Sequence, residues 1–174
     1  MKEPVVIAVV GSKSSGKTTT IEALTRELTK RGFRIAAVKH IPEPNFTIDT
    51  AGKDTWRFAS SGAKTVISVA QNEISTIEKV NTTNFSLKEI LQKCRSHDIV
   101  FLEGFRLLVG KDKNIYKIVV VKSAGEASEA VENFEPILVF TGLHPIENMN
   151  AKIPYVSLLE NAGKIVDMIE RLAV

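Results

Sequence analysis

The sequence predicts an α/β fold of three layers, in which helices cover both faces of a largely parallel sheet. Three observations indicate this fold class. Short apolar runs alternate along the chain with amphipathic stretches, as expected where each strand is followed by a helix. Several runs are apolar at every position, which is typical of strands buried on both faces. The amphipathic stretches space their apolar residues three or four positions apart, as a helix requires.

The predicted strands and helices follow one another along the whole chain. The strands are short apolar runs covering residues 5–10, 35–38, 65–70, 99–102, 115–121, 137–140 and 155–156. A first helix is predicted over residues 18–31, before the helix-ending Gly32. A second helix opens at the capping box of residues 86–89. A last helix carries one apolar face, formed by Leu158, Ala162, Ile165, Ile169 and Leu172.

Two segments break this alternation and predict antiparallel hairpins. Residues 65–80 look like two strands joined near Gln71 and Asn72, and residues 107–121 look like a second hairpin around residues 110–114. Both hairpins would add strands to the parallel core. No linker sets them apart, so we expect residues 1–174 to form a single nucleotide-binding domain.

Composition excludes several other classes of protein. The net charge of +3 is small and the basic residues are scattered, which argues against nucleic acid as a partner. The single cysteine, Cys94, forms no disulfide framework and fits a reducing compartment. No apolar run reaches the roughly 18 residues of a transmembrane helix, and the first residues are too polar for a signal peptide. We therefore expect a cytoplasmic protein without membrane contact.

Residues 11–18, GSKSSGKT, match the pattern G-x-x-x-x-G-K-[ST] between the first predicted strand and the first predicted helix. Glycine permits the backbone angles that turn N–H groups around an anion, and the helix points its positive end at the same place. Lys17 would contact the β- and γ-phosphates, and the Thr18 hydroxyl would bind Mg²⁺. The sequence thus predicts a P-loop NTPase fold whose phosphate-binding residues are Gly11, Ser12, Lys13, Ser14, Ser15, Gly16, Lys17, Thr18 and Thr19.

The metal also needs an acidic residue, and the strand predicted over residues 99–102 has one at each end. Asp98 and Glu103 are about 16 Å apart in an extended chain, so only one can belong to the site. Ligands of open α/β sheets bind at the carboxyl ends of strands. We therefore expect Glu103 to act with Lys17 in catalysis and to hold Mg²⁺, directly or through water. A surface acid at a strand end is the alternative for Glu103.

The long polar segment of residues 38–63 follows the second predicted strand, and such loops are usually functional or disordered. Asp49 is a candidate for a second metal-binding acid. Lys53 and Arg57 would share one face of a helix and could meet phosphate. No histidine or cysteine lies near His40 at the spacing of zinc ligands. His40 is therefore predicted to form hydrogen bonds, in preference to binding zinc. The segment's charged residues and histidine include Lys39, His40, Asp49, Lys53, Asp54 and Arg57.

The sequence resembles the molybdopterin-guanine dinucleotide biosynthesis protein B (MobB) family in four segments: residues 11–19, 38–40, 49–63 and 102–105. The resemblance implies a homodimeric protein that binds GTP and Mg²⁺ and has weak GTPase activity. It also implies assistance to the molybdopterin guanylyltransferase, or to other molybdenum-cofactor proteins. The sequence departs from the family at HIPEPNF (40–46), which lacks a second histidine, at Phe58 and at Arg106.

The residues alone leave three mechanisms open. A slow GTPase acting as an adaptor, a small-molecule kinase and a nucleotide-gated binding module would share the same phosphate loop. A kinase usually brings several arginines to the transferred phosphoryl group, and only Arg57 and Arg106 lie near the predicted site. The guanine-reading sequence Asn-Lys-x-Asp is missing, so the preference for GTP rests on the resemblance. Residues 141–145 are candidates for contacting the base.

Overall fold

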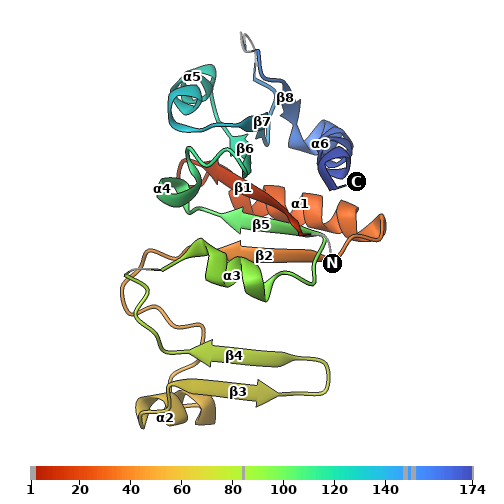
Figure 1. The fold of residues 1–174 in the computed structure, drawn as a ribbon. Coiled ribbons are helices and arrows are strands. Elements are labelled where there is room, and N and C mark those ends of the chain that lie inside the picture. The colour runs from red at the N-terminus through yellow and green to blue at the C-terminus, as the bar shows by residue number, and fades with distance from the viewer. Residues whose placement is uncertain (1–2, 84, 147–148, 150–151, 174) are drawn as a thin grey trace. The chain divides into compact units, whose positions relative to one another are not determined.

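The computed structural model describes residues 3–83, 85–146, 149 and 152–173. Contacts within the chain define two compact units (Figure 1). The first unit combines Met1–His40 with Leu87–Val174, and the second is Ile41–Ser86. The expectation of a single domain over residues 1–174 stays a prediction, and each unit is described by itself.

The first unit is built on a six-stranded sheet in the order β2-β5-β1-β6-β7-β8. Every neighbouring pair is parallel, which confirms the predicted fold class. The strand predictions within this unit are correct to within a residue or two at each end. The strands are β1 (Val5–Gly11), β2 (Ile35–Lys39), β5 (Ile99–Glu103), β6 (Tyr116–Val120), β7 (Ile137–Gly142) and β8 (Tyr155–Ser157).

Helices cover both faces of this sheet. Ile7 and Val9 of β1 join the apolar core under two long helices, whereas Ala8, one position out of phase, is equally buried on the opposite face. On that opposite face, Val119 of β6 and Ala130 of another helix line one small cavity. The helices are α1 (Lys17–Lys30), α3 (Leu87–Lys93), α4 (Arg106–Val109), α5 (Ala124–Asn133) and α6 (Leu158–Ala173).

The second unit contains the short helix α2 (Asp54–Ser60) and a two-stranded antiparallel sheet of β3 (Thr65–Val69) and β4 (Ile74–Glu78). The hairpin predicted over residues 65–80 is therefore confirmed. Its strands form a sheet of their own, however, and do not extend the parallel sheet of the first unit.

The other predicted hairpin, over residues 107–121, is wrong. Its first half is the short helix α4, and its second half is β6, which pairs in parallel with β1 and β7. Gly110 continues the helical backbone instead of opening a turn. Lys117, in the second half of this segment, is fully buried, and its ammonium donates to the carbonyl oxygens of Asp112 and Glu135 at 2.6 Å each. Burial lowers the pKa of Lys117.

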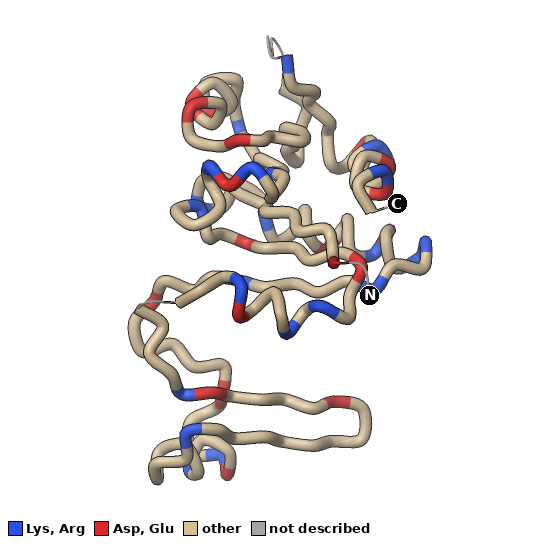
Figure 2. Tube along the Cα trace, in the orientation of Figure 1, with Lys and Arg blue, Asp and Glu red and all other residues tan. Residues whose placement is uncertain are grey.

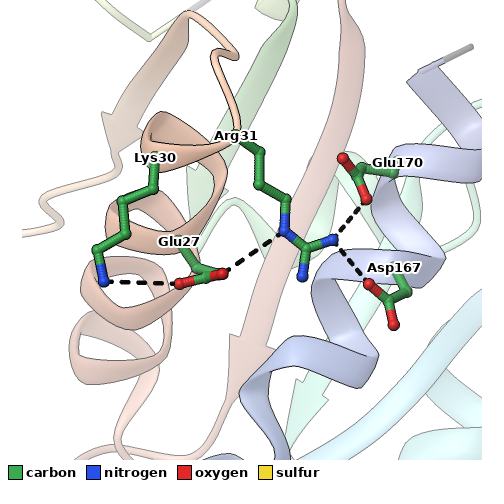
Figure 3. Close-up of polar contacts among 5 residues, drawn as sticks. All are labelled: Glu27, Lys30, Arg31, Asp167 and Glu170. Carbon is green, nitrogen blue, oxygen red and sulfur yellow. Dashed lines mark hydrogen bonds and ion pairs between the residues drawn. The ribbon is translucent and has the colours of Figure 1, made fainter.

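Charged side chains join α1 to α6 on the surface of the first unit (Figure 3). Arg31 immediately follows α1, and its guanidinium lies 2.7 Å from Asp167 and 2.5 Å from Glu170 of α6, and 3.5 Å from Glu27 of α1. Hydrogen bonds to Asp167 and then Glu170 raise the pKa of Arg31. Each exposed ion pair contributes little to the free energy of unfolding. The packing of α1 against α6 therefore depends mainly on their apolar side chains in the core. Elsewhere basic and acidic residues are spread over many elements (Figure 2).

Asp98 immediately precedes β5 and binds Arg34 through two side-chain hydrogen bonds of 2.7 and 3.1 Å. Its carboxylate also accepts the backbone N–H of Arg34 at 2.8 Å. The Arg34 guanidinium lowers the pKa of Asp98 to about 2. The sequence indicated only that a strand begins here. The structure adds an ion pair that joins the beginnings of β2 and β5.

Replacing Asp98 with asparagine is expected to lower the free energy of unfolding at neutral pH and to have less effect in acid. The folded pKa of about 2 lies below the value of about 3.9 for a free aspartate. The carboxylate therefore stabilises the fold above about pH 4, and this contribution disappears as the pH falls through the folded pKa. Urea unfolding of both proteins across this range measures the difference. A difference that stays constant down to about pH 2 would contradict the ion pair as its source.

None of the described helices is long and apolar enough to cross a membrane.

Candidate nucleotide site

The phosphate loop lies between β1 and α1, as predicted, and its fold depends on close backbone approach. A Cβ atom at Gly11 would lie 2.3 Å from the carbonyl oxygen of Val120 on the neighbouring strand. Gly16 has a φ of 100°, in the left-handed region, and a Cβ there would press on the Leu143 side chain at 3.2 Å. The two glycines of the motif therefore serve two needs: contact with β6, and the turn into α1.

Lys17 begins α1 and folds back over its own loop. Its ammonium donates to the carbonyl oxygens of Ser12 at 2.6 Å and Gly11 at 3.3 Å. Burial lowers the pKa of Lys17, and the Glu103 carboxylate opposes that shift. Both of these partners are neutral carbonyl groups, and an anionic group would bind the ammonium more strongly.

Most of the predicted phosphate-binding residues surround one open hollow of about 500 Å³. Gly11 and Ser12 instead line a smaller cavity of about 110 Å³, to which α5 contributes part of the lining. There the Ser12 hydroxyl donates to Glu126 at 3.2 Å. The residues lining the main hollow are Lys13, Ser14, Ser15, Gly16, Lys17, Thr18, Thr19, Lys39, Glu103 and Leu143.

Glu103 ends β5 in register with Val9 of β1, which places its carboxylate beside the start of α1. The Thr18 hydroxyl donates to this carboxylate, with distances of 3.0 and 3.1 Å to its two oxygens. The Lys39 ammonium lies 3.1 Å from the same group. The structure thus brings together Lys17, Thr18 and Glu103, while Asp98 begins the same strand at its other end, as strand direction predicted.

Thr18 and Glu103 offer the oxygen donors that suit Mg²⁺. Magnesium is usually held by one or two protein oxygens together with nucleotide phosphates and water. Within the described residues there is no group of three or more histidine, cysteine, aspartate or glutamate side chains that could hold a metal. The donors present therefore fit a metal that arrives with a nucleotide.

The backbone after Glu103 turns sharply. Gly104 and Phe105 both have positive φ, at 86° and 54°, before α4 begins. The Phe105 ring lies 5.2 Å from the His40 ring, and the His40 backbone N–H donates to the Glu103 carbonyl oxygen at 3.0 Å. His40 thus supports the end of β5 through its backbone and ring.

Asp49, predicted as a second metal-binding acid, belongs to the second unit. One of its carboxylate oxygens accepts the Thr55 hydroxyl at 2.9 Å and the Thr50 backbone N–H at 2.8 Å, so it organises the start of α2. Its role toward a metal stays a prediction. Arg57, also on α2, lies 3.6 Å from Asp54, and the Trp56 side chain is partly exposed.

The sequence interpretation missed three contributors to this region: Lys39 as a partner of Glu103, Glu126 as a partner of Ser12, and the helix α5 that carries Glu126. A signal for α5 was available, because residues 123–126 (SAGE) match the capping-box pattern. In the structure the Ser123 hydroxyl accepts the Glu126 backbone N–H at 3.2 Å.

Comparison with known proteins gives consistent matches. Residues 6–141 match the model of the family described as molybdopterin guanine dinucleotide synthesis protein B. A putative molybdopterin-guanine dinucleotide biosynthesis adapter protein of Methanocaldococcus jannaschii is 34% identical over 136 residues, covering 77% of this chain and 54% of that protein. The corresponding adapter protein of Haemophilus influenzae is 34% identical over 103 residues, covering 58% of this chain and 57% of that protein. The chain thus spans little more than half the length of these two relatives.

Solved structures agree in fold. A crystal structure of molybdopterin-guanine biosynthesis protein B superposes with a TM-score of 0.72 at 26% identity, covering 97% of this chain and 99% of that one. The crystal structure of Bacillus subtilis MobB gives a TM-score of 0.74 at 20% identity, covering 96% of each chain, which bears on the fold alone.

Proposed function

The chain belongs to the molybdopterin guanine dinucleotide synthesis protein B family, and on that basis we propose that it binds GTP with Mg²⁺ and hydrolyses it slowly. In this proposal it acts in the cytoplasm as an adaptor in molybdopterin guanine dinucleotide biosynthesis. Its partner is the guanylyltransferase that attaches the nucleotide, or another protein of molybdenum-cofactor assembly.

The observation that carries the proposal is the meeting of Lys17, Thr18 and Glu103 around one hollow. The loop's N–H groups and the N-terminus of α1 would bind the phosphates, and the Lys17 ammonium would exchange the carbonyl oxygens of Gly11 and Ser12 for phosphate oxygens. Thr18 and Glu103 would hold Mg²⁺, which supplies neutralisation of phosphate charge when bound. Glu103 would also orient the attacking water, directly or through the metal's shell.

Slow hydrolysis is favoured over phosphoryl transfer to a second substrate by the lining of the hollow. Among the described residues that line it, the cations are lysines, and Arg106 lines the smaller cavity beside it instead. Phosphoryl transfer usually relies on arginines placed around the transferred group. The lining therefore supports triphosphate binding and slow hydrolysis assisted by Glu103 better than it supports phosphoryl transfer to a second substrate.

Guanine recognition is proposed for residues 141–145, which form the end of β7 and the segment after it, at the same edge of the sheet as the phosphate loop. Leu143 lines the phosphate hollow and packs against Gly16, so this segment begins beside the phosphates. A homodimer is proposed as the working form. The second unit supports it, because apolar side chains of its two-stranded sheet are strongly exposed, namely Ile67, Val69 and Ile74.

Titration calorimetry with GTP and ATP, each with and without Mg²⁺, tests this function. We expect GTP to bind more tightly than ATP, and Mg²⁺ to strengthen GTP binding. A product assay on the same samples should detect free phosphate released slowly. Phosphoryl transfer to an added small molecule would favour a kinase instead. Binding without any turnover would favour a nucleotide-gated binding module.

A further inference from the structure

The last residue of β2, Lys39, points its charge at the same carboxylate that faces the phosphate loop. Register pairs Lys39 with Glu103, and Glu103 in turn with Val9 of β1. The Lys39 ammonium lies 3.1 Å from a Glu103 oxygen. Lys39 also lines the phosphate hollow, together with Lys17. The end of β2 therefore contributes a cation to the site from two strands away.

The two partners of this ion pair differ in their surroundings. The Glu103 side chain is only 13% exposed, and a carboxylate so placed needs an opposite charge or hydrogen-bond donors. The Lys39 side chain is 55% exposed and rests on a flexible stem. Water can therefore solvate Lys39 when it leaves Glu103, whereas the less exposed Glu103 then needs another cation in its place.

We propose that Lys39 is a second phosphate-binding cation, which neutralises Glu103 while the site holds no nucleotide and turns to the terminal phosphate of a nucleoside triphosphate when Glu103 serves a metal. This inference rests on the proposed function, because it assumes nucleotide phosphates and a metal at the same site. It gives the chain a means of telling triphosphate from diphosphate.

Geometry makes this exchange possible. Adjacent strands lie about 4.8 Å apart, so the ends of β2 and β1 are separated by roughly 10 Å, with Glu103 between them. A terminal phosphate that extends beyond the phosphates bound by Lys17 would lie in that interval, within the hollow that Lys17, Lys39 and Glu103 line. Lys39 and Lys17 line the same hollow, so both ammonium groups can act on one ligand. Two neighbouring ammonium groups favour the ligand with more negative charge.

The expected preference for triphosphate over diphosphate follows from which phosphate each lysine can contact. Lys17 starts α1 and serves the phosphates nearest the loop, which a diphosphate and a triphosphate share. Lys39 approaches from the far side of Glu103, where only the terminal phosphate of a triphosphate would extend. Removing Lys39 should therefore weaken the triphosphate complex selectively.

The test compares the variants Lys39→Met and Lys39→Arg with the unmodified protein. Affinities for GTP, GDP, ATP and ADP are measured by calorimetry with Mg²⁺ in excess. Lys30→Met is the matched control, because Lys30 also pairs with a glutamate, at 3.7 Å, but stands at the other end of α1. We expect Lys39→Met to reduce the affinity for GTP at least about tenfold, as for loss of a hydrogen bond to a charged group. Its affinity for GDP should stay unchanged.

Lys39→Arg should keep most of the preference for triphosphate, and Lys30→Met should keep all of it. Equal losses for GTP and GDP, or no loss for either, would overturn the proposal and leave Lys39 as a surface ion pair. Circular dichroism of each variant checks that the fold is retained. An unmodified protein that binds only ATP and ADP would overturn guanine recognition while still testing Lys39 on those two ligands. If it binds none of the four, both proposals fail.

Discussion

Replacement of Lys17 with alanine is expected to abolish nucleotide binding, with an affinity loss of at least about a hundredfold, near the upper range for a hydrogen bond to a charged group. Lys17 is the loop's own cation, and its ammonium already lies over the carbonyl oxygens of Ser12 and Gly11. Without it the phosphates would meet only backbone N–H groups and the N-terminus of α1. Those groups bind anions, but they supply no full charge.

Calorimetric titration with GTP and Mg²⁺ measures this loss. Lys30→Ala, at the other end of the same helix, is the control and should bind like the unmodified protein. Thermal unfolding should show that the Lys17 variant is folded, because the bonds lost are two part-buried contacts to carbonyl groups of the loop and not contacts of the apolar core. Micromolar affinity retained by Lys17→Ala would contradict the assignment of residues 11–19 as the phosphate site.

Replacement of Glu103 with alanine is expected to reduce Mg²⁺-dependent hydrolysis by about 10- to 100-fold, the usual effect of removing a group that holds or orients a metal's ligands. Nucleotide binding without Mg²⁺ should change much less, because removing a negative charge beside the phosphates costs that complex nothing. The structural reason is that the Glu103 carboxylate accepts the Thr18 hydroxyl at 3.0 Å, so the two form one oxygen cluster.

Phosphate release with varied Mg²⁺, and nucleotide binding in the presence of a chelator, separate the two effects. Glu103→Gln keeps an acceptor for Thr18 without the charge, and should resemble the alanine variant in hydrolysis. Asp98→Ala is the matched control, since Asp98 is the acid at the opposite end of the same strand. Equal losses of metal-free binding and hydrolysis in Glu103→Ala would instead make Glu103 a structural residue.

Much of the parallel sheet could be predicted because its strands are buried on both faces and appear as short apolar runs. The choice of Glu103 as a candidate site residue followed from the direction of one strand. Ligands bind where parallel strands end, so Glu103 could be chosen over Asp98 without knowing which strands are neighbours. The structure then placed Glu103 beside Thr18.

The errors have physical causes. The segment of residues 107–121 has the polar turn and flanking apolar residues of a hairpin, but the backbone at Gly104 and Phe105 reverses into a helix before any strand can form. The burial of Lys117 could not be predicted either, because the sequence alone does not place the Asp112 and Glu135 carbonyl oxygens that accept hydrogen bonds from its ammonium.

The contacts of Lys39 and Ser12 could not be predicted for a different reason. Each crosses between elements distant in sequence: Lys39 to Glu103, and Ser12 to Glu126. Such contacts depend on the strand order β2-β5-β1-β6, in which consecutive strands of the chain are not neighbours. Residue type indicates that these groups can form charged contacts, and only the topology selects the partner.

The approach of Gly11 to β6 has a consequence for genetics. Because a Cβ atom there would lie 2.3 Å from the Val120 carbonyl oxygen, any substitution must separate two central strands of the sheet. In a screen for loss of function, alleles at codon 11 would therefore be recovered as low-abundance protein cleared by proteases. Alleles at codon 17 would be recovered at normal abundance. Residues 11–19 thus include a position at which substitution disrupts the fold and a position at which substitution disrupts ligand binding.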